Sequence, residues 1–244
     1  MSKLYDMIAA HYDVIFPFNA AKGEFLLSAW AESAKGKRVL EVGCGTGSLS
    51  IWLAERGCEV VGIDLDAEMV RHAILKAEDV KGCASFRELN MLDLDVAFSH
   101  AEFDAVVCFG NTLVHLEDDQ AILRFLRGAR QCLHPGGHLL LQILNYDRIL
   151  CEGIDELPLV ETEDLIFERS YRLSKEHRKI DFGIRLTDTS SDETMQSQTM
   201  LYAIGADQLC ALFEEAGFSR VTRLGDYTRT EFCSDSFSLV IDAV

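Results

Sequence analysis

The chain has 244 residues, of which 48% are hydrophobic, so it can bury the core of one large domain or of a domain with an insertion. Its 40 acidic side chains outnumber 23 basic ones, and the formal charge of −17 disfavours nucleic acids and anionic membranes as partners. The eight cysteines include no CxxC pair, which is typical of reduced thiols in a cytoplasmic protein. The sequence has neither a signal-peptide core nor an apolar run long enough to span a membrane, so we expect a cytoplasmic location.

The first 35 residues predict a helical segment ahead of the main fold. Apolar side chains recur at helical spacing over residues 3–16 and 20–34, and Pro17 separates the two stretches. We therefore expect residues 1–35 to form a helical cover on the domain that follows.

The central part of the chain alternates between two kinds of pattern. Short apolar segments with polar or glycine borders predict strands at 38–43, 59–64, 85–90, 103–109 and 136–144. Helical patterns lie between most of them, at about 47–56, 67–79 and 118–132. This alternation predicts an α/β fold with a doubly wound, mostly parallel sheet, which two final strands near 218–226 and 234–242 extend to seven strands.

Residues 152–203 follow a different pattern. Residues 152–168 hold seven carboxylates and no Lys or Arg, which indicates an exposed connection. Alternation with period two then predicts antiparallel strands, before a helix that ends at Gly217. We expect one domain over residues 1–244, in which 152–203 form a small antiparallel β insertion that serves as a lid or, equally, as the interface of a homodimer.

The stretch VLEVGCGTGSLS places Gly43, Gly45 and Gly47 at alternate positions directly after a predicted strand. A strand that leads through a glycine-rich turn into a helix is typical of nucleotide binding at the carboxyl edge of a parallel sheet. The dinucleotide fingerprint requires its third glycine five residues after the first, whereas Gly47 follows Gly43 by four. The spacing therefore disfavours a dinucleotide.

Two carboxylates narrow the choice of ligand. Asp64 ends the second strand, seventeen residues after Gly47, where an acidic residue suits a ribose diol. Glu41 precedes the glycines, and a carboxylate there repels a pyrophosphate but can help to hold a cationic amino group. The pattern favours a cationic adenosine ligand without phosphates.

Five motifs occur in order: VLEVGCGTG, VVGIDLDAEMV, FRELNMLDL, FDAVVCFGNTLVHL and LHPGG. On these the chain resembles the class I S-adenosylmethionine-dependent methyltransferases of the small-molecule type, strongly over residues 38–144 and loosely elsewhere. The resemblance implies a Rossmann-like methyltransferase fold, with S-adenosyl-L-methionine as cofactor and S-adenosyl-L-homocysteine as product. It also implies methyl transfer to a nitrogen, oxygen or carbon of a small molecule by in-line displacement.

The same resemblance implies which residues bind the cofactor. Glu41 and the backbone from Gly43 through Cys44 and Gly45 to Gly47 would face its methionine part. Asp64 would bind the ribose hydroxyls, and Leu65 and Met69 would lie against the adenine.

Three more positions complete this expected cofactor site. Asn90 stands where the family usually has an acidic residue that accepts from the adenine amino group, and its side-chain oxygen can still accept. Met91 would donate its backbone N–H to the ring, and Phe109 would offer its carbonyl to the methionine ammonium. Tyr12 matches an aromatic residue that folds over the cofactor, or it anchors a helix on the sheet.

We expect His115, Asn111 and Tyr12 to handle the substrate. His115 can accept a proton near neutral pH, although a lone histidine is more often a packing or capping residue. Asn111 is equally a pocket residue or a turn former. The segment around these residues supplies neither clustered carboxylates for a metal nor the Asn/Asp-Pro-Pro-aromatic motif of adenine and glutamine N-methyltransferases, so no metal is expected.

Two alternatives stay open at this point. One is an NAD(P)-dependent oxidoreductase on a Rossmann-like fold, which the glycine spacing opposes. The other is a non-catalytic homologue that retains the cofactor pocket. The sequence does not identify the methyl acceptor.

Overall fold

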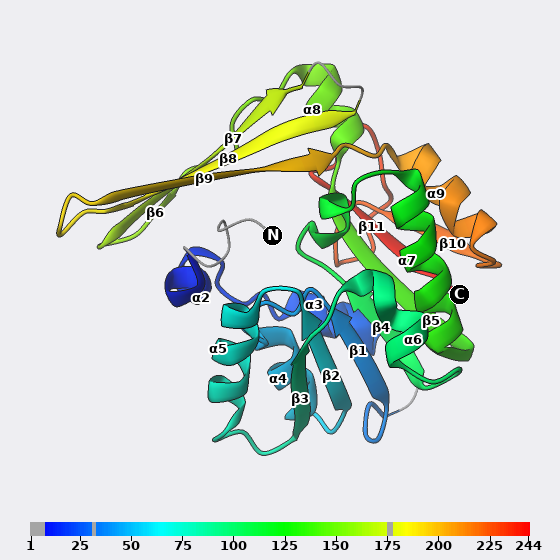
Figure 1. Cartoon of the computed structure of the whole chain (residues 1–244). Helices are drawn as coiled ribbons and strands as arrows, with labels where there is room; N and C mark the ends of the chain where they lie inside the picture. The colour runs from blue at the N-terminus through cyan, green and yellow to red at the C-terminus, as the bar shows by residue number, and fades with distance from the viewer. Residues whose placement is uncertain (1–7, 31–32, 175–177) are drawn as a thin grey trace.

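A computed structural model of the chain describes residues 8–30, 33–174 and 178–244. It contains a seven-stranded sheet with the order β10-β11-β5-β4-β1-β2-β3 and a separate four-stranded sheet with the order β6-β7-β8-β9 (Figure 1). The predicted α/β fold, with a mostly parallel sheet and a small antiparallel insertion, is confirmed.

The strands of the large sheet lie close to their predicted positions. They are β1 (Arg38–Val42), β2 (Glu59–Asp64), β3 (Cys83–Glu88), β4 (Phe103–Cys108), β5 (Leu133–Leu144), β10 (Val221–Leu224) and β11 (Ser238–Ala243). Neighbours from β3 to β5 pair in parallel, whereas β11 runs antiparallel to both β5 and β10. β5 begins three residues earlier than predicted, and its pairing with β4 shifts register between Phe103 and Ala105.

Helices cover both faces of this sheet. The longer ones are α4 (Ser48–Ala54), α5 (Ala67–Ala77), α7 (Asp119–Cys132), α8 (Tyr146–Glu152) and α9 (Ala206–Glu215), and the short ones are η2 (Met91–Asp93), α6 (Leu94–Ala97) and η3 (Thr112–His115). Polar side chains fix where several of them begin, because they accept the free N–H groups of the first turn. Asp66 does so for α5, Asp118 for α7 and Asn145 for α8.

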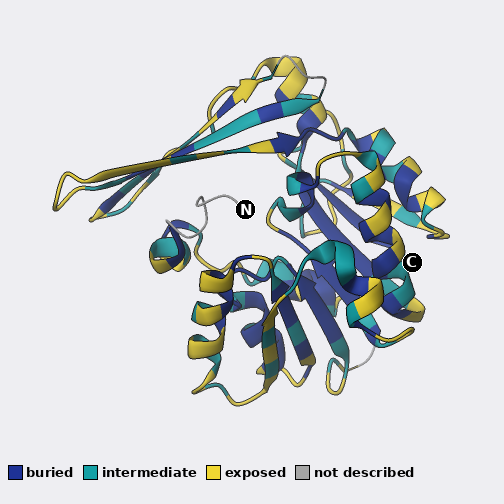
Figure 2. Cartoon of the chain, in the orientation of Figure 1, coloured by how far each residue is buried: buried dark blue, intermediate teal, exposed yellow. Residues whose placement is uncertain are grey.

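The alternation of β1 divides the core between the two faces of the sheet. Leu40 and Val42 belong to the larger cluster, which α7 and α9 cover. Val39 points to the other face, where it packs in a cluster with Phe25 of α3 (Ala21–Leu27) and Leu53 of α4. Figure 2 shows the consequence, since the strands at the centre of the sheet are dark blue along their length.

The N-terminal segment is helical over part of the predicted span. It contains η1 (Ala9–His11), α2 (Tyr12–Ile15) and α3, while residues 1–7 and 31–32 lie outside the described residues. We refer to residues 8–27 as the cover.

The second sheet consists of β6 (Val160–Glu161), β7 (Leu165–Leu173), β8 (Lys179–Asp188) and β9 (Thr194–Tyr202), all paired antiparallel. We call it the insertion sheet. Figure 1 shows its strands reaching from the body of the molecule across to α2. Buried Leu165, Phe167 and Ile184 of this sheet form one cluster with Ile8 and Ile15 of the cover. The cover and the insertion sheet are therefore packed together.

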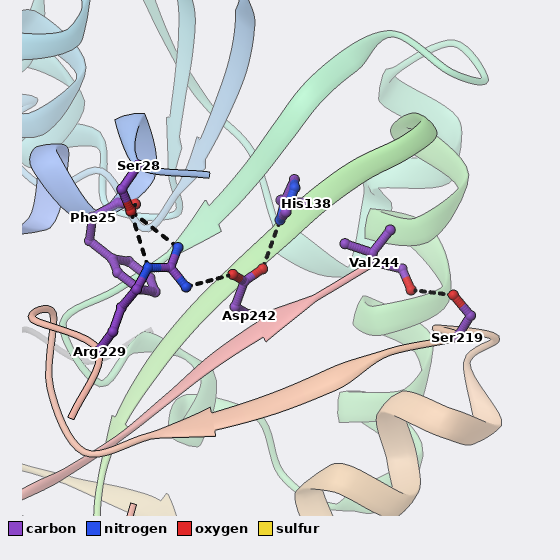
Figure 3. A network of polar contacts seen from close by, with 7 residues as sticks. All are labelled: Phe25, Ser28, His138, Ser219, Arg229, Asp242 and Val244. Atoms are coloured by element: carbon purple, nitrogen blue, oxygen red, sulfur yellow. Dashed lines mark hydrogen bonds and ion pairs between the residues drawn. The ribbon is translucent and has the colours of Figure 1, made fainter. Parts of the chain in front are cut away.

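A polar network connects α3 and the residue after it with the last strand (Figure 3). Asp242 of β11 lies 2.7 Å from Nδ1 of His138 and accepts from Arg229 at 3.2 Å. Burial acts to raise the pKa of Asp242, but the hydrogen bonds from His138 and Arg229 outweigh it and lower the pKa. Arg229 also donates to Ser28 and lies over the ring of Phe25, so the network fastens α3 to the last strand.

Candidate cofactor and acceptor site

A cavity of about 460 Å³ lies at the carboxyl ends of β1, β2 and β4, bounded by the glycine loop, η2, η3 and α7. Tyr12 of the cover and Thr199 of β9 complete its wall. Ligands of open α/β sheets bind at this edge, so the cavity stands where the sequence predicts a nucleotide.

The three glycines of the loop all adopt the left-handed backbone, with φ of 71° at Gly43, 53° at Gly45 and 77° at Gly47. A Cβ at Gly43 would lie 2.4 Å from Thr112, and one at Gly47 would lie 2.7 Å from the ring of Phe86. These two glycines are thus required by contacts within the protein. Of the three, Gly43 and Gly45 line the cavity, and a Cβ at Gly45 would meet the ring of Tyr12 at 3.3 Å.

Asp64 is fixed at the cavity edge by backbone donors. Its Oδ2 accepts from the N–H of Gly45 at 2.8 Å, and its Oδ1 accepts from the N–H of Asp66 at 3.0 Å. Burial raises the pKa of Asp64, and these backbone hydrogen bonds oppose that shift. The Asp64 carboxylate therefore fixes the position of the glycine loop relative to the end of β2, and Asp64 also lines the cavity.

Glu41 lies away from the cavity wall. Because it alternates with Leu40, it shares the face of β1 that packs on α4, and its Oε2 accepts from the Ser50 hydroxyl at 2.5 Å. Burial raises the pKa of Glu41 to about 7, although the Ser50 hydrogen bond and the charge of Lys22 lower it. In the structure this carboxylate lies between β1 and α4, and its contact with the methionine part of the cofactor stays a prediction.

Cys44 and Phe109 are buried and are not among the residues that line the cavity. Cys44 is buried, and its backbone N–H donates to the carbonyl of Ile63 at 2.9 Å. The ring of Phe109 packs against Phe25 and Tyr227, and its carbonyl accepts from the Thr112 hydroxyl at 2.8 Å.

The end of the cavity beyond Asp64 is apolar. Leu65, Met69 and Met91 line it, as the sequence predicts for an adenine pocket, together with Leu89 and Leu92. Asn90 lines it too, but its side-chain oxygen accepts from the N–H of Leu92 at 2.9 Å and so caps η2. If this oxygen also accepts from the adenine amino group, as the sequence predicts, it must do so while it accepts from the N–H of Leu92.

Tyr12 packs over Gly45 of the glycine loop and is held there by its neighbour Asp13. Asp13 accepts from the hydroxyls of Thr46 and Ser48 at 2.6 and 3.1 Å, and Lys76 of α5 donates to the same three side chains. Burial, helped by the negative charge of Asp64, raises the pKa of the Tyr12 phenol, which therefore stays protonated.

The other end of the cavity is formed by η3, the turn after it, α7 and β9, whose proximity the sequence analysis does not predict. His115, Leu116 and Glu117 come from η3 and the turn after it, Ala121 from α7 and Thr199 from β9. Burial lowers the pKa of His115 to about 4, so its imidazole is neutral at physiological pH. We refer to this end as the acceptor end. Of its residues the sequence predicted only His115, because nothing in the pattern of β9 indicates that Thr199 faces a ligand.

Both the oxygen and the nitrogen of the Asn111 side-chain amide form hydrogen bonds within the protein. Its Oδ1 accepts from the N–H of Leu144 at 3.0 Å, and its Nδ2 donates to the hydroxyl of Tyr146 at 2.9 Å. The backbone at Asn111 is left-handed, with φ of 67°. Asn111 does not line the cavity, and the turn-former interpretation accounts for all of these contacts.

Metal-ligand clusters and membrane-spanning helices can be assessed over residues 8–30, 33–174 and 178–244. Within them, no group of three or more His, Cys, Asp or Glu side chains is placed to hold a metal ion. No helix among them is both long and apolar enough to cross a membrane.

Comparison with known proteins agrees with the geometry. Residues 39–137 match the methyltransferase domain family. Glycine N-methyltransferase from Mus musculus is 39% identical over 126 residues, which cover 48% of this chain but only 43% of the mouse protein. Glycine/sarcosine N-methyltransferase from Parasynechococcus marenigrum is 29% identical over 89% of this chain and 76% of its own length.

The fold has a counterpart among solved structures. The CcbJ methyltransferase from Streptomyces caelestis superimposes with a TM-score of 0.80 at 22% identity, covering 97% of this chain and 95% of that one. The seven-stranded sheet, the glycine loop and the matched residues agree with one another. Residues 39–137 are similar to the methyltransferase domain family, and the fold is similar to that of solved methyltransferases.

Proposed function

We propose that this protein transfers a methyl group from S-adenosylmethionine to an amine nitrogen of a small molecule. The observation that carries the proposal is the continuity of the cavity, which runs from Asp64 and the glycine loop to the acceptor end without a break. The relatives named as glycine and sarcosine N-methyltransferases support nitrogen over oxygen or carbon as the nucleophile.

The residues present fit the cofactor. Asp64 offers a fixed carboxylate for the two ribose hydroxyls, and the apolar wall of Leu65, Met69 and Met91 suits a flat base. Gly110 lines the same cavity with φ of 77°, and no atom lies within 4 Å of where its Cβ would be, so the wall is open there. Tyr12 would lie over the sulfonium end.

The protein's contribution to the reaction is alignment and exclusion of water. When bound, the cofactor supplies an activated methyl group. The side chains of the acceptor end would hold the amine with its lone pair in line with that group, while Tyr12 and Thr199 close the cavity from the side of the cover and of the insertion sheet. The nitrogen becomes positively charged as the new bond forms, and its proton then leaves to water.

His115 would act as a hydrogen-bond partner in this scheme. A histidine whose pKa is about 4 is too weak a base to remove a proton from an alkylammonium ion. The amine must therefore enter as the free base or lose its proton on entry, and we expect the reaction rate to rise with pH as that fraction increases.

The test is a titration with S-adenosylhomocysteine, followed by its release from S-adenosylmethionine in the presence of amines. Asp64→Ala should raise the Kd by a factor equivalent to about 1–3 kcal/mol because the ribose loses its acceptor. Gly45→Val should abolish binding, since its side chain would enter the space between the loop and Tyr12. Glu55→Gln is the control, because this exposed residue directly after α4 does not line the cavity.

Mass spectrometry of the purified protein for retained S-adenosylmethionine or S-adenosylhomocysteine gives an independent readout. If both site variants bind S-adenosylhomocysteine as the parent does, the proposed binding residues are wrong. If the parent binds it but methylates only phenols or thiols, amine transfer is wrong while the cofactor site stands.

A further inference from the structure

We propose that the acceptor end selects an amine that carries no carboxylate, and so excludes free amino acids such as glycine. This inference rests on the proposed function and assigns a substrate class within it. The relatives named as glycine and glycine/sarcosine N-methyltransferases would instead suggest an amino acid as the acceptor.

The first observation is the charge of the wall. Among the described residues that line the cavity, three are carboxylic acids, Asp64, Asp66 and Glu117, and none is lysine or arginine. His115 adds no positive charge, because its imidazole is neutral above about pH 4. The charged side chains among these described residues are therefore all acidic, with Asp64 and Asp66 after β2 and Glu117 at the acceptor end.

A carboxylate on the acceptor would find no partner in such a wall. An anion that is taken out of water has to be paired with a cation or with several hydrogen-bond donors, and like charges placed side by side are strongly unfavourable. An amine that carries an amide, a hydroxyl or a hydrocarbon group in place of the carboxylate avoids that cost. The negative wall also attracts an alkylammonium ion from solution.

Glu117 is the acidic residue best placed to act on the acceptor. It is the first of three consecutive carboxylates, and the next two are committed elsewhere: Asp118 caps α7, and Asp119 accepts from Tyr202 and Gln208. The side chain of Glu117 makes no such bond in the described structure, and the residue lines the acceptor end. It can therefore approach an incoming ammonium group.

Two cations near this end, Lys179 and Arg178, contact Tyr202. Lys179 donates to the backbone carbonyl of Glu117 and lies 5.3 Å from the centre of the Tyr202 ring. It does not line the cavity. The hydrogen bond holds the turn that carries Glu117 against the start of β8, and the exposed Glu117 is the acidic residue among those that line the acceptor end.

Matched pairs of amines test the selection. Each pair has the same amine with a carboxylate or with the corresponding amide: glycine and glycinamide, β-alanine and β-alaninamide, γ-aminobutyrate and γ-aminobutyramide. We expect kcat/KM, or the affinity for the complex with S-adenosylhomocysteine, to favour the uncharged member of each responsive pair by at least about tenfold. The γ-amino pair carries most weight, because its two amines differ little in basicity.

The Glu117 side chain is tested by Glu117→Gln. We expect KM for the preferred amine to rise about three- to tenfold, with kcat and the affinity for S-adenosylhomocysteine little changed. Glu117→Asp should restore part of the loss, because it restores the charge. Glu55→Gln removes the same charge away from the cavity and should change none of these values.

The outcomes separate the two proposals. Equal or better use of the carboxylate-bearing amines overturns the selection, while amine methylation stands. Binding of S-adenosylhomocysteine with no response to any of the six amines, and turnover of phenols or thiols instead, overturns amine methylation and the selection with it. An unchanged KM in Glu117→Gln, together with a preference for the uncharged amines, removes Glu117 from the proposal.

Discussion

Asn111 is a residue whose sequence context fits two roles, and its contacts distinguish them. It follows β4 at the edge where ligands bind, so a role in the pocket is a reasonable expectation. Its backbone, however, is left-handed, a conformation that asparagine tolerates better than other residues with a Cβ. Together with Gly110, whose N–H donates to Gln142 at 2.8 Å, it turns the chain from β4 towards η3.

We expect Asn111→Ala to lower the free energy of unfolding by roughly 2–3 kcal/mol, because alanine strains the left-handed turn and leaves the N–H of Leu144 without its acceptor. Asn111→Gly loses the same hydrogen bonds but keeps the backbone relaxed, so it should be less destabilising by about 1 kcal/mol. Urea unfolding of both variants measures the difference. Equal losses would mean that strain at this turn is negligible.

The glycine loop shows a limit of the sequence analysis at the same scale. The strand, the turn and the helix are legible because apolar runs and glycines mark them locally. The reason for each glycine is not legible, since it depends on residues far along the chain. Gly47 makes room for Phe86 of β3, and only the fold brings the two together.

Among the elements, the insertion sheet has its own hydrophobic contact with the rest of the molecule. Phe167 is 1% exposed and meets the ring of Phe16 edge-on, with centroids 5.6 Å apart. It packs in the same cluster as Met69, which lines the cavity. The sheet is thereby connected to the cofactor site through the cover.

We expect Phe167→Ala to reduce the free energy of unfolding by about 3–5 kcal/mol and to loosen the sheet from the cover, because it leaves a cavity between them. Limited proteolysis of the segment 152–203 should become faster in this variant. Ile166→Ala, on the opposite side of the same strand and only partly buried, should have a much smaller effect. Identical proteolysis in both variants would contradict this packing role.

The sequence predicts β7 and β8 well because each alternates polar and apolar residues over several positions, and β9 follows the same pattern less cleanly. It misses α8, in which only Tyr146 and Ile149 are buried, too few to show a helical period. It also cannot show that β9 reaches the cavity, because that depends on how far the insertion sheet extends from the body.

For the molecule as a whole, two buried groups give stability opposite dependences on pH. Glu41 has a folded-state pKa of about 7, above its ordinary value, so the stability it contributes is full below about pH 4.5 and is lost as pH rises through 7. His115 has a folded-state pKa of about 4, below its ordinary value of 6.5, so its contribution is full above pH 6.5 and is lost as pH falls through 4.

Glu41→Gln isolates one of these contributions. Near pH 5 the parent and the variant should unfold at similar urea concentrations, because buried Glu41 is neutral there. At pH 8 the variant should be the more stable by roughly 3 kcal/mol, since the parent then carries a buried charge. His115 is common to both proteins and cancels in the comparison. A difference that stays constant from pH 5 to pH 8 would rule out this titration.

The cluster that joins the cover to the insertion sheet has a consequence for the order of events in turnover. Tyr12 lies over the cofactor end and Thr199 beside the acceptor end, yet both belong to elements bound together through Phe167, Ile8 and Ile15. The cover and the insertion sheet therefore close both ends of the cavity together. If they move apart as one unit, both products can leave, so we expect the release of S-adenosylhomocysteine and of the methylated amine to be kinetically coupled.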